Sequence, residues 1–401
     1  FFNYTKFDNY GSSILSVHFI IFLSIFYLLN KKFDFLDSLE NNLKKTFFLV
    51  FAPTILYFFF NKNFSEIGLV GHWSWGDDWD AFEMFARTIV VDGEWLEAGE
   101  TMFYFRPGAR YIYAFFHIIF GHSKFIFSIA ETWMIILSAF LLSKIGINLN
   151  LDKKLSFLSG ILLMILFFGD NYRWLIGRGL SEYYGLFLII FIAYHFSKQN
   201  LSWNKLILLS IVGVVGTWIR EEYGLIIVSL IFFSLLNNYN KNKINNFFVL
   251  VINFIKKNFN KIFFYGLFVT IGFLCLFLRN YLLSGKFGLF DHPNLIGDVY
   301  HTRDDFLIWY RMFFNAEWPA KPKFTSIFLI SGFFISIISI FNIKLIKSNI
   351  CLPITIFLVL MPFTFLSNMG YVPRYTINYL PFCILINAFL INYFLEKFKK
   401  I

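Results

Sequence analysis

Three aspartates lie within four residues of one another in the segment 71–80, which reads GHWSWGDDWD. The segment follows an apolar run and precedes an amphipathic stretch at 81–91. Gathering the carboxylates of Asp77, Asp78 and Asp80 beside apolar sequence is unfavourable unless they bind a cation, a sugar or a proton. We therefore expect Asp77 or Asp78 to act as a general base or to bind a divalent cation, Mg²⁺ or Mn²⁺. The alternative is capping of the following helix, a role that we assign to Asp78 rather than to Asp77.

A second set of polar residues stands between apolar runs farther along the chain. Arginine binds phosphate and carboxylate in a bidentate manner, so we expect this set to bind an anionic headgroup. The alternative is a structural network of ion pairs, in which Glu182 pairs with Arg178 or caps a helix. Arg220 could likewise close a tight turn with Glu221 and Glu222. The candidate binding residues are Arg106, Arg110, Arg173, Glu182, Arg220, Glu221, Arg374 and Tyr375.

The elements that position these residues are predicted to be membrane-spanning helices. Hydrophobic residues make up 58% of the chain and charged residues 15%, and the mean hydropathy is +0.62. A soluble domain of 401 residues could not bury so much apolar surface. The fold class is therefore all-α, a polytopic transmembrane helical bundle of about eleven spans with interfacial helices in its first external loop. The predicted spans are 12–30, 46–60, 124–143, 155–169, 183–197, 206–219, 223–237, 262–280, 325–341, 350–366 and 377–395.

A further apolar stretch at 108–122 is not expected to cross the membrane. If it crossed, the loop with Lys144, Lys153 and Lys154 would lie opposite the other lysine clusters, against the positive-inside rule. We expect this stretch to lie in the interface as an amphipathic or re-entrant helix, with Pro107 in its first turn. The chain then divides into N-terminal spans (1–60), a first external loop (61–123), a transmembrane core (124–278), a second external loop (279–324) and C-terminal spans with a cytoplasmic tail (325–401).

Lysines and arginines separate along this topology. Most lysines fall in segments predicted to be cytoplasmic, namely 31–45, 144–154, 198–205, 238–261, 342–349 and the tail after 395. Every arginine falls in the outward segments 61–123, 170–182, 220–222, 279–324 and 367–376. Lysine orients the protein, whereas outward arginine has no topological reason to be there. The net charge of +10 therefore indicates a membrane and an outward anionic ligand, and no nucleic acid.

The order of the outward motifs resembles that of a known superfamily. GDD at 76–78, DGEWL at 92–96 and FRPG at 105–108 are similar to the first external loop of the GT-C glycosyltransferases, such as the aminoarabinose transferases and the protein O-mannosyltransferases. The segments 173–182 and 217–224, and Arg374 with Tyr375, resemble later outward motifs of the same enzymes. At 105–107 the family usually has acidic or Pro-Pro residues, and this chain has Phe-Arg-Pro instead.

The resemblance implies a multi-pass glycosyltransferase of the bacterial inner membrane, with its active site on the periplasmic side. It implies a polyprenyl-phosphate sugar donor held among membrane lipids, and a glycan, lipid or protein acceptor. The catalytic or metal-binding acid of the family carries onto Asp77 or Asp78, its second acidic residue onto Glu182, and its phosphate-binding arginine onto Arg374. The alternatives are a transporter or flippase for a lipid-linked saccharide, and a polysaccharide polymerase or ligase.

Overall fold

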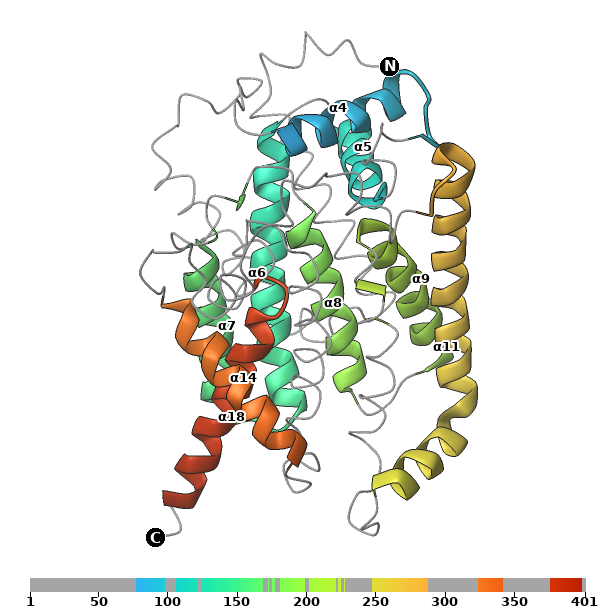
Figure 1. Ribbon diagram of the computed structural model, residues 1–401. Coiled ribbons are helices and arrows are strands. Elements are labelled where there is room, and N and C mark those ends of the chain that lie inside the picture. The colour runs from blue at the N-terminus through green and yellow to red at the C-terminus, as the bar shows by residue number, and fades with distance from the viewer. Residues whose placement is uncertain are drawn as a thin grey trace, which may run out of the picture. The chain divides into compact units, whose positions relative to one another are not determined.

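The computed structural model describes a helical protein (Figure 1). The described residues are 77–97, 106–120, 124–168, 172, 175–176, 181–198, 202–220, 223–224, 227, 247–287, 324–341 and 376–398, and none of them forms a β-strand. The helices are α4 (Asp77–Val91), α5 (Gly108–Phe120), α6 (Lys124–Asn148), α7 (Lys153–Phe168), α8 (Glu182–Ser197), α9 (Trp203–Ile219), α11 (Phe247–Ser284), α14 (Thr325–Phe341) and α18 (Leu380–Phe398).

The described helices coincide closely with apolar runs predicted from the sequence. Among the described residues, three segments are long and apolar enough to cross a membrane: Ala130–Asn148, Ile255–Ser284 and Leu380–Phe398. Shorter apolar helices occupy Glu182–Ser197, Trp203–Ile219 and Thr325–Ile338. The predicted spans 12–30, 46–60 and 350–366 lie outside the described residues, as does most of 223–237. The all-α prediction is thus confirmed for the described part, and the count of about eleven spans stays a prediction.

One segment predicted to connect two spans is helical in part, and its place on the cytoplasmic side stays a prediction. The stretch 238–261 was expected to be a cytoplasmic loop, but residues 247–261 belong to α11. Hydropathy located the start of the apolar run at 262, but the helix begins earlier. It includes the lysines and asparagines that precede this run. Lysine is a good helix former, so a charged sequence beside a span need not leave the helix.

The chain forms two compact units, with a boundary inside α6. The first unit contains α4, nearly all of α5 and the first part of α6. In α5 the exposed side chains are apolar, Phe115 and Ile118, whereas Arg110 and His117 are buried. A helix that faces water shows the opposite distribution, with charged side chains exposed and apolar side chains buried. The 13 residues of α5 extend about 20 Å, and the expectation that 108–122 lies in the interface stays a prediction.

The second unit contains the end of α6 and the helices α7, α8, α9, α11, α14 and α18. The turn from α6 to α7 is closed by Asp152, whose carboxylate accepts hydrogen bonds from the backbone N–H groups of Lys154 (2.9 Å) and Leu155 (3.2 Å). Such a cap fixes the start of α7. A Cβ atom placed on Gly160 would lie 2.6 Å from the carbonyl oxygen of Ala139, so α7 can approach α6 closely only because glycine stands there.

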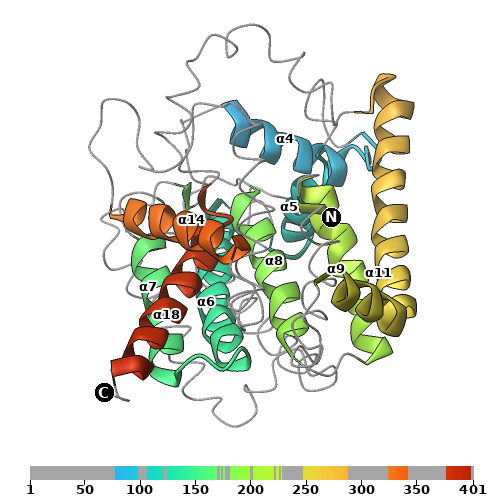
Figure 2. The ribbon, with the colours of Figure 1, turned by 60° about the horizontal axis from the view of Figure 1, so that its bottom comes forward.

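Small residues also bring α9 and α11 together, side by side in Figures 1 and 2. A Cβ atom placed on Gly272 would lie 2.6 Å from a methyl group of Val214, and the Trp218 indole donates a hydrogen bond of 3.0 Å to the carbonyl oxygen of Gly272. Close approach at small residues is typical of helix pairs in membranes. Opposite this interface, α11 exposes an uninterrupted apolar stripe at Ile252, Ile255, Phe259, Phe263, Leu267, Ile271, Leu274 and Leu278. An apolar face of this length fits contact with lipid.

The second unit separates its lysine-rich turns from its buried charges. The Asn148 amide donates to the Ser197 hydroxyl at 2.8 Å, which joins the end of α6 to the end of α8. The ring centroids of Trp203 and Phe264 are 5.6 Å apart, which adds the start of α9 and the N-terminal part of α11 to the same end. We call this the lysine end, since it carries Lys153, Lys154, Lys198, Lys205, Lys256, Lys257 and Lys261. The start of α8 and the end of α9 lie at the opposite end, as the predicted topology requires.

Candidate functional site

A buried ion pair joins the start of α8 to the end of α9. Nη1 of Arg220 lies 3.0 Å from Oε1 of Glu182, and the side chains are 3% and 1% exposed. Glu182 is the first residue of α8, where the positive end of the helix dipole favours an acid. Arg220 follows the last residue of α9, where the dipole favours a cation. Each charge is therefore stabilised by its own helix as well as by its partner.

Tyr223 extends this pair toward the segment that precedes α18. Its hydroxyl donates a hydrogen bond of 3.0 Å to Oδ1 of Asn378, and Cζ of Arg220 lies 6.0 Å from its ring centroid. The ring packs directly against the backbone of α8, because a Cβ atom placed on Gly185 would lie only 1.8 Å from Cε2 of Tyr223. Gly185 is thus required for Tyr223 to reach Asn378.

Two further tyrosines connect the end of α7 to the same segment. The hydroxyls of Tyr172 and Thr376 are 2.7 Å apart and share a hydrogen bond. The Tyr183 hydroxyl donates to the carbonyl oxygen of Tyr172 at 2.9 Å. Together with the residues above they form what we call the polar cluster, whose members are all buried: Tyr172, Glu182, Tyr183, Arg220, Tyr223, Thr376 and Asn378.

The segment that contains Arg106 passes beside the end of α9. A Cβ atom placed on Gly108 would lie 2.5 Å from the backbone nitrogen of Ile219, so the two backbones are in direct contact. Arg106, two residues earlier, is half-buried. This contact brings part of the predicted first external loop next to the residue that precedes Arg220.

The structure thus brings together two of the predicted binding residues, Glu182 and Arg220. Glu182 and Arg220 are bonded to each other, an arrangement that neither pairing alternative in the sequence contained. Arg173, Glu221, Arg374 and Tyr375 lie outside the described residues, but each is one or two positions from a member of the polar cluster. Arg110 is fully buried in the first unit.

The predicted catalytic aspartates begin α4 in the first unit. Asp77 and Asp78 are the first two helical residues, within the first turn, where acids are favoured by the helix dipole. The residues before Asp77 lie outside the described part of the chain, so the assignment of Asp78 as the capping residue stays a prediction. The side chains of Asp77 and Asp78 lie outside the described part of the structure.

Five members of the polar cluster were not predicted as site residues: Tyr172, Tyr183, Tyr223, Thr376 and Asn378. Each stands one to four positions from a predicted site residue, at or just before the start of an apolar run or shortly after the end of one. These hydroxyl and amide groups could have been predicted as site residues from their place at the ends of apolar runs, since polar groups buried among apolar helices need hydrogen-bond partners.

Among the described residues no group of three or more His, Cys, Asp or Glu side chains could hold a metal ion. The polar cluster offers a single carboxylate, Glu182, which is already bonded to Arg220. A divalent cation at Asp77 and Asp78 therefore stays a prediction from the sequence.

Fold and site define a helical protein, compatible with a membrane protein, that buries a charged and hydroxyl-rich cluster at one end of its second unit. Comparison with protein-family models, with curated proteins and with solved structures finds no match to this chain.

Proposed function

We propose that the protein is a glycosyltransferase of the GT-C type, which transfers a sugar from a polyprenyl-phosphate donor to an acceptor at the outward face of a membrane. The observation that supports this proposal is the polar cluster. It gathers residues from two of the separate segments whose sequences resemble outward motifs of that superfamily, 173–182 and 217–224, together with residues that closely follow Arg374 and Tyr375 in the sequence. It lies at the end opposite the lysines. A lipid-linked substrate must present its headgroup at the end of the helices, where hydrocarbon gives way to polar groups.

In this proposal the arginines bind the donor phosphate. The carboxylate of Glu182 holds the guanidinium of Arg220 in one orientation, which prepares it for planar recognition of phosphate. Arg374 and Tyr375 directly precede Thr376, which is fixed by its hydrogen bond to Tyr172. Positive charge at this point stabilises the phosphate as it leaves the sugar.

Asp77 or Asp78 supplies the base in the same proposal. One carboxylate removes or orients the proton of the acceptor hydroxyl, so that its oxygen can attack the sugar carbon. A divalent cation bound by Asp77 and Asp78 would offset part of the negative charge of their carboxylates. The proposal is confined to an outward acceptor hydroxyl and does not specify the donor sugar.

The test measures donor binding and sugar transfer by the full chain in liposomes supplied with polyprenyl-phosphate sugars. Arg374→Ala should weaken donor binding by roughly 10- to 150-fold, because a charged hydrogen-bond partner is worth about 1.5–3 kcal/mol. One of Asp77→Asn and Asp78→Asn should bind donor yet transfer sugar about 10²–10⁴-fold more slowly. Lys205→Gln, at the lysine end, is the control and should leave both unchanged.

Two results would count against the proposal. Unchanged donor affinity in Arg374→Ala would remove that residue from the phosphate site. Full transfer in both asparagine variants would remove the base and favour a transporter of lipid-linked saccharides, since a transporter needs no base at this position.

A further inference from the structure

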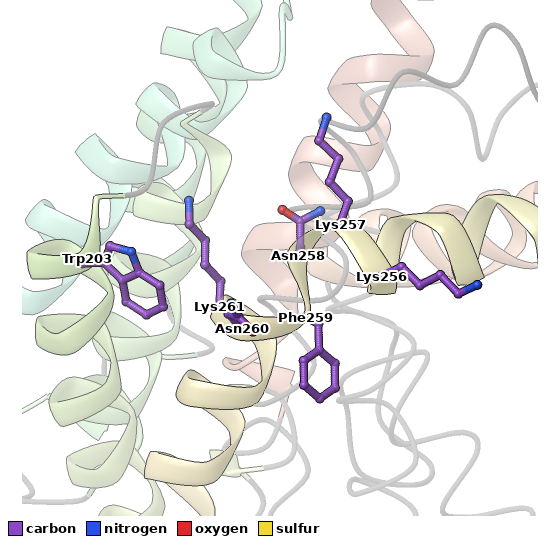
Figure 3. Close-up of a pocket in the computed structure, with 7 residues that line it drawn as sticks. All are labelled: Trp203, Lys256, Lys257, Asn258, Phe259, Asn260 and Lys261. Carbon is purple, nitrogen blue, oxygen red and sulfur yellow. The ribbon is translucent and has the colours of Figure 1, made fainter.

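A basic pocket lies at the lysine end of the second unit, at the opposite end of α9 from Arg220. Its volume is about 300 Å³, and it is lined by Trp203 of α9 and by residues 256–261 of α11 (Figure 3). Three of those α11 residues are lysines, Lys256, Lys257 and Lys261, and no acidic residue lines the pocket. The pocket is open to the surface and is at the small end of the range for small-molecule sites.

The pocket forms where α11 changes direction. Figure 3 shows the helix bending between Lys257 and Lys261, with these two lysines on one side of the bend and Phe259 on the other. Phe259 belongs to the exposed apolar stripe of α11 and is 54% exposed. Lys257 and Lys261 thus lie apart from Phe259 at the bend, and Lys256 points away from these two lysines.

The sequence on either side of the bend fits a membrane boundary. The 30 residues from Ile255 to Ser284 are apolar enough to cross a membrane, and the preceding residues of α11, 247–254, read FFVLVINF. An apolar helix that turns at its first lysines is expected to lie along the interface before it enters the hydrocarbon. Trp203 is half-exposed at the same level, and tryptophan is enriched at that boundary.

We propose that this pocket binds the phosphate of an anionic phospholipid from the membrane leaflet at the lysine end. Lysine ammonium groups supply the positive charge, and the asparagine side chains at 258 and 260 supply amide donors to headgroup oxygens. Phe259 and Trp203 provide the apolar contact that a lipid has and a free phosphate ion lacks. The inference concerns a site other than the polar cluster and does not depend on the proposed transfer reaction.

The experiment titrates phosphatidylglycerol onto the detergent-solubilised full chain and counts bound lipids by native mass spectrometry. Lys257→Gln/Lys261→Gln should weaken binding about 25-fold, because each lysine near an anionic lipid surface is worth about fivefold. Lys153→Gln/Lys154→Gln is the matched control, since it removes two exposed lysines from the same end outside the pocket. Lys257→Arg/Lys261→Arg keeps the charge and should retain binding, which separates loss of charge from misfolding.

Phosphatidylcholine and inorganic phosphate are the comparison ligands. Weak binding of both, with tight binding of phosphatidylglycerol, supports the proposal. An equal loss of phosphatidylglycerol binding in Lys153→Gln/Lys154→Gln would show that binding depends only on the total charge of the lysine end. That result would overturn the proposal. Inorganic phosphate that displaces phosphatidylglycerol at equal concentration would assign the pocket to a soluble anion instead.

Discussion

At the scale of single residues, the main feature of the polar cluster is the buried ion pair of Glu182 and Arg220. Both side chains are almost fully buried, and charges removed from water lose several kcal/mol of hydration each. Burying such a pair is a weak source of stability compared with apolar packing. Its position between two helix ends fits a positioning role for Arg220 better than a stabilising one.

The first prediction separates the pair from its members. Glu182→Gln or Arg220→Met alone should lower the free energy of unfolding by about 3–5 kcal/mol, because the remaining charge stays buried without compensation. The double variant should lose less than the sum of the two losses. Thermal unfolding in detergent measures all three, and strictly additive losses would show that the two charges do not interact.

The second prediction concerns the packing of Tyr223. Gly185→Ala should destabilise the protein and disrupt the Tyr223–Asn378 hydrogen bond, because the new methyl group overlaps the tyrosine ring. Gly266→Ala is the matched control, since it lies in a helix with no atom within 4 Å of the added Cβ. It should be neutral or stabilise by up to ~1 kcal/mol. Equal stability of the two variants, compared by thermal unfolding, would contradict the packing seen here.

At the scale of helices, the sequence predicted position better than length. The run 325–341 coincides with α14, which carries no charged residue along its length. The run 206–219 missed the start of α9, which begins at Trp203 after Ser202, whose side chain accepts a hydrogen bond from the Lys205 N–H at 3.4 Å. Hydropathy ignores such a cap, although a serine before a helix is readable in the sequence.

The third prediction places α11 in lipid. A nitroxide spin label at Leu274→Cys should collide often with oxygen and rarely with a water-soluble nickel chelate, because this side chain is exposed and apolar. A label at Val269→Cys, on the buried face of the same helix, should collide rarely with both. The labels are introduced after the native cysteines are replaced. Frequent collision of the nickel chelate at position 274 would show that this face meets water.

At the scale of the whole chain, the sequence predicted which segments share an end but not which side chains bond there. Lysine clusters indicated that 144–154 and 198–205 lie together, and the Asn148–Ser197 hydrogen bond agrees. The bond from Arg220 to Glu182 joins residues 38 positions apart, and the bond from Tyr223 to Asn378 joins residues 155 apart. Pairings of this kind depend on helix packing, which periodicity alone does not specify.

The last prediction assigns the two ends of the second unit to the two sides of the membrane. Single cysteines that replace Lys153 and Lys257, at the lysine end, should be protected from a membrane-impermeant thiol reagent added outside intact cells. A cysteine that replaces Arg374 should react with it. The reason is that translocation retains lysine-rich loops in the cytoplasm. Disruption of the cells before labelling should make positions 153 and 257 reactive, which controls for burial. If position 153 reacted from outside, the topology would be inverted around α6 and α7, and the expectation that 108–122 stays in the interface would fail with it.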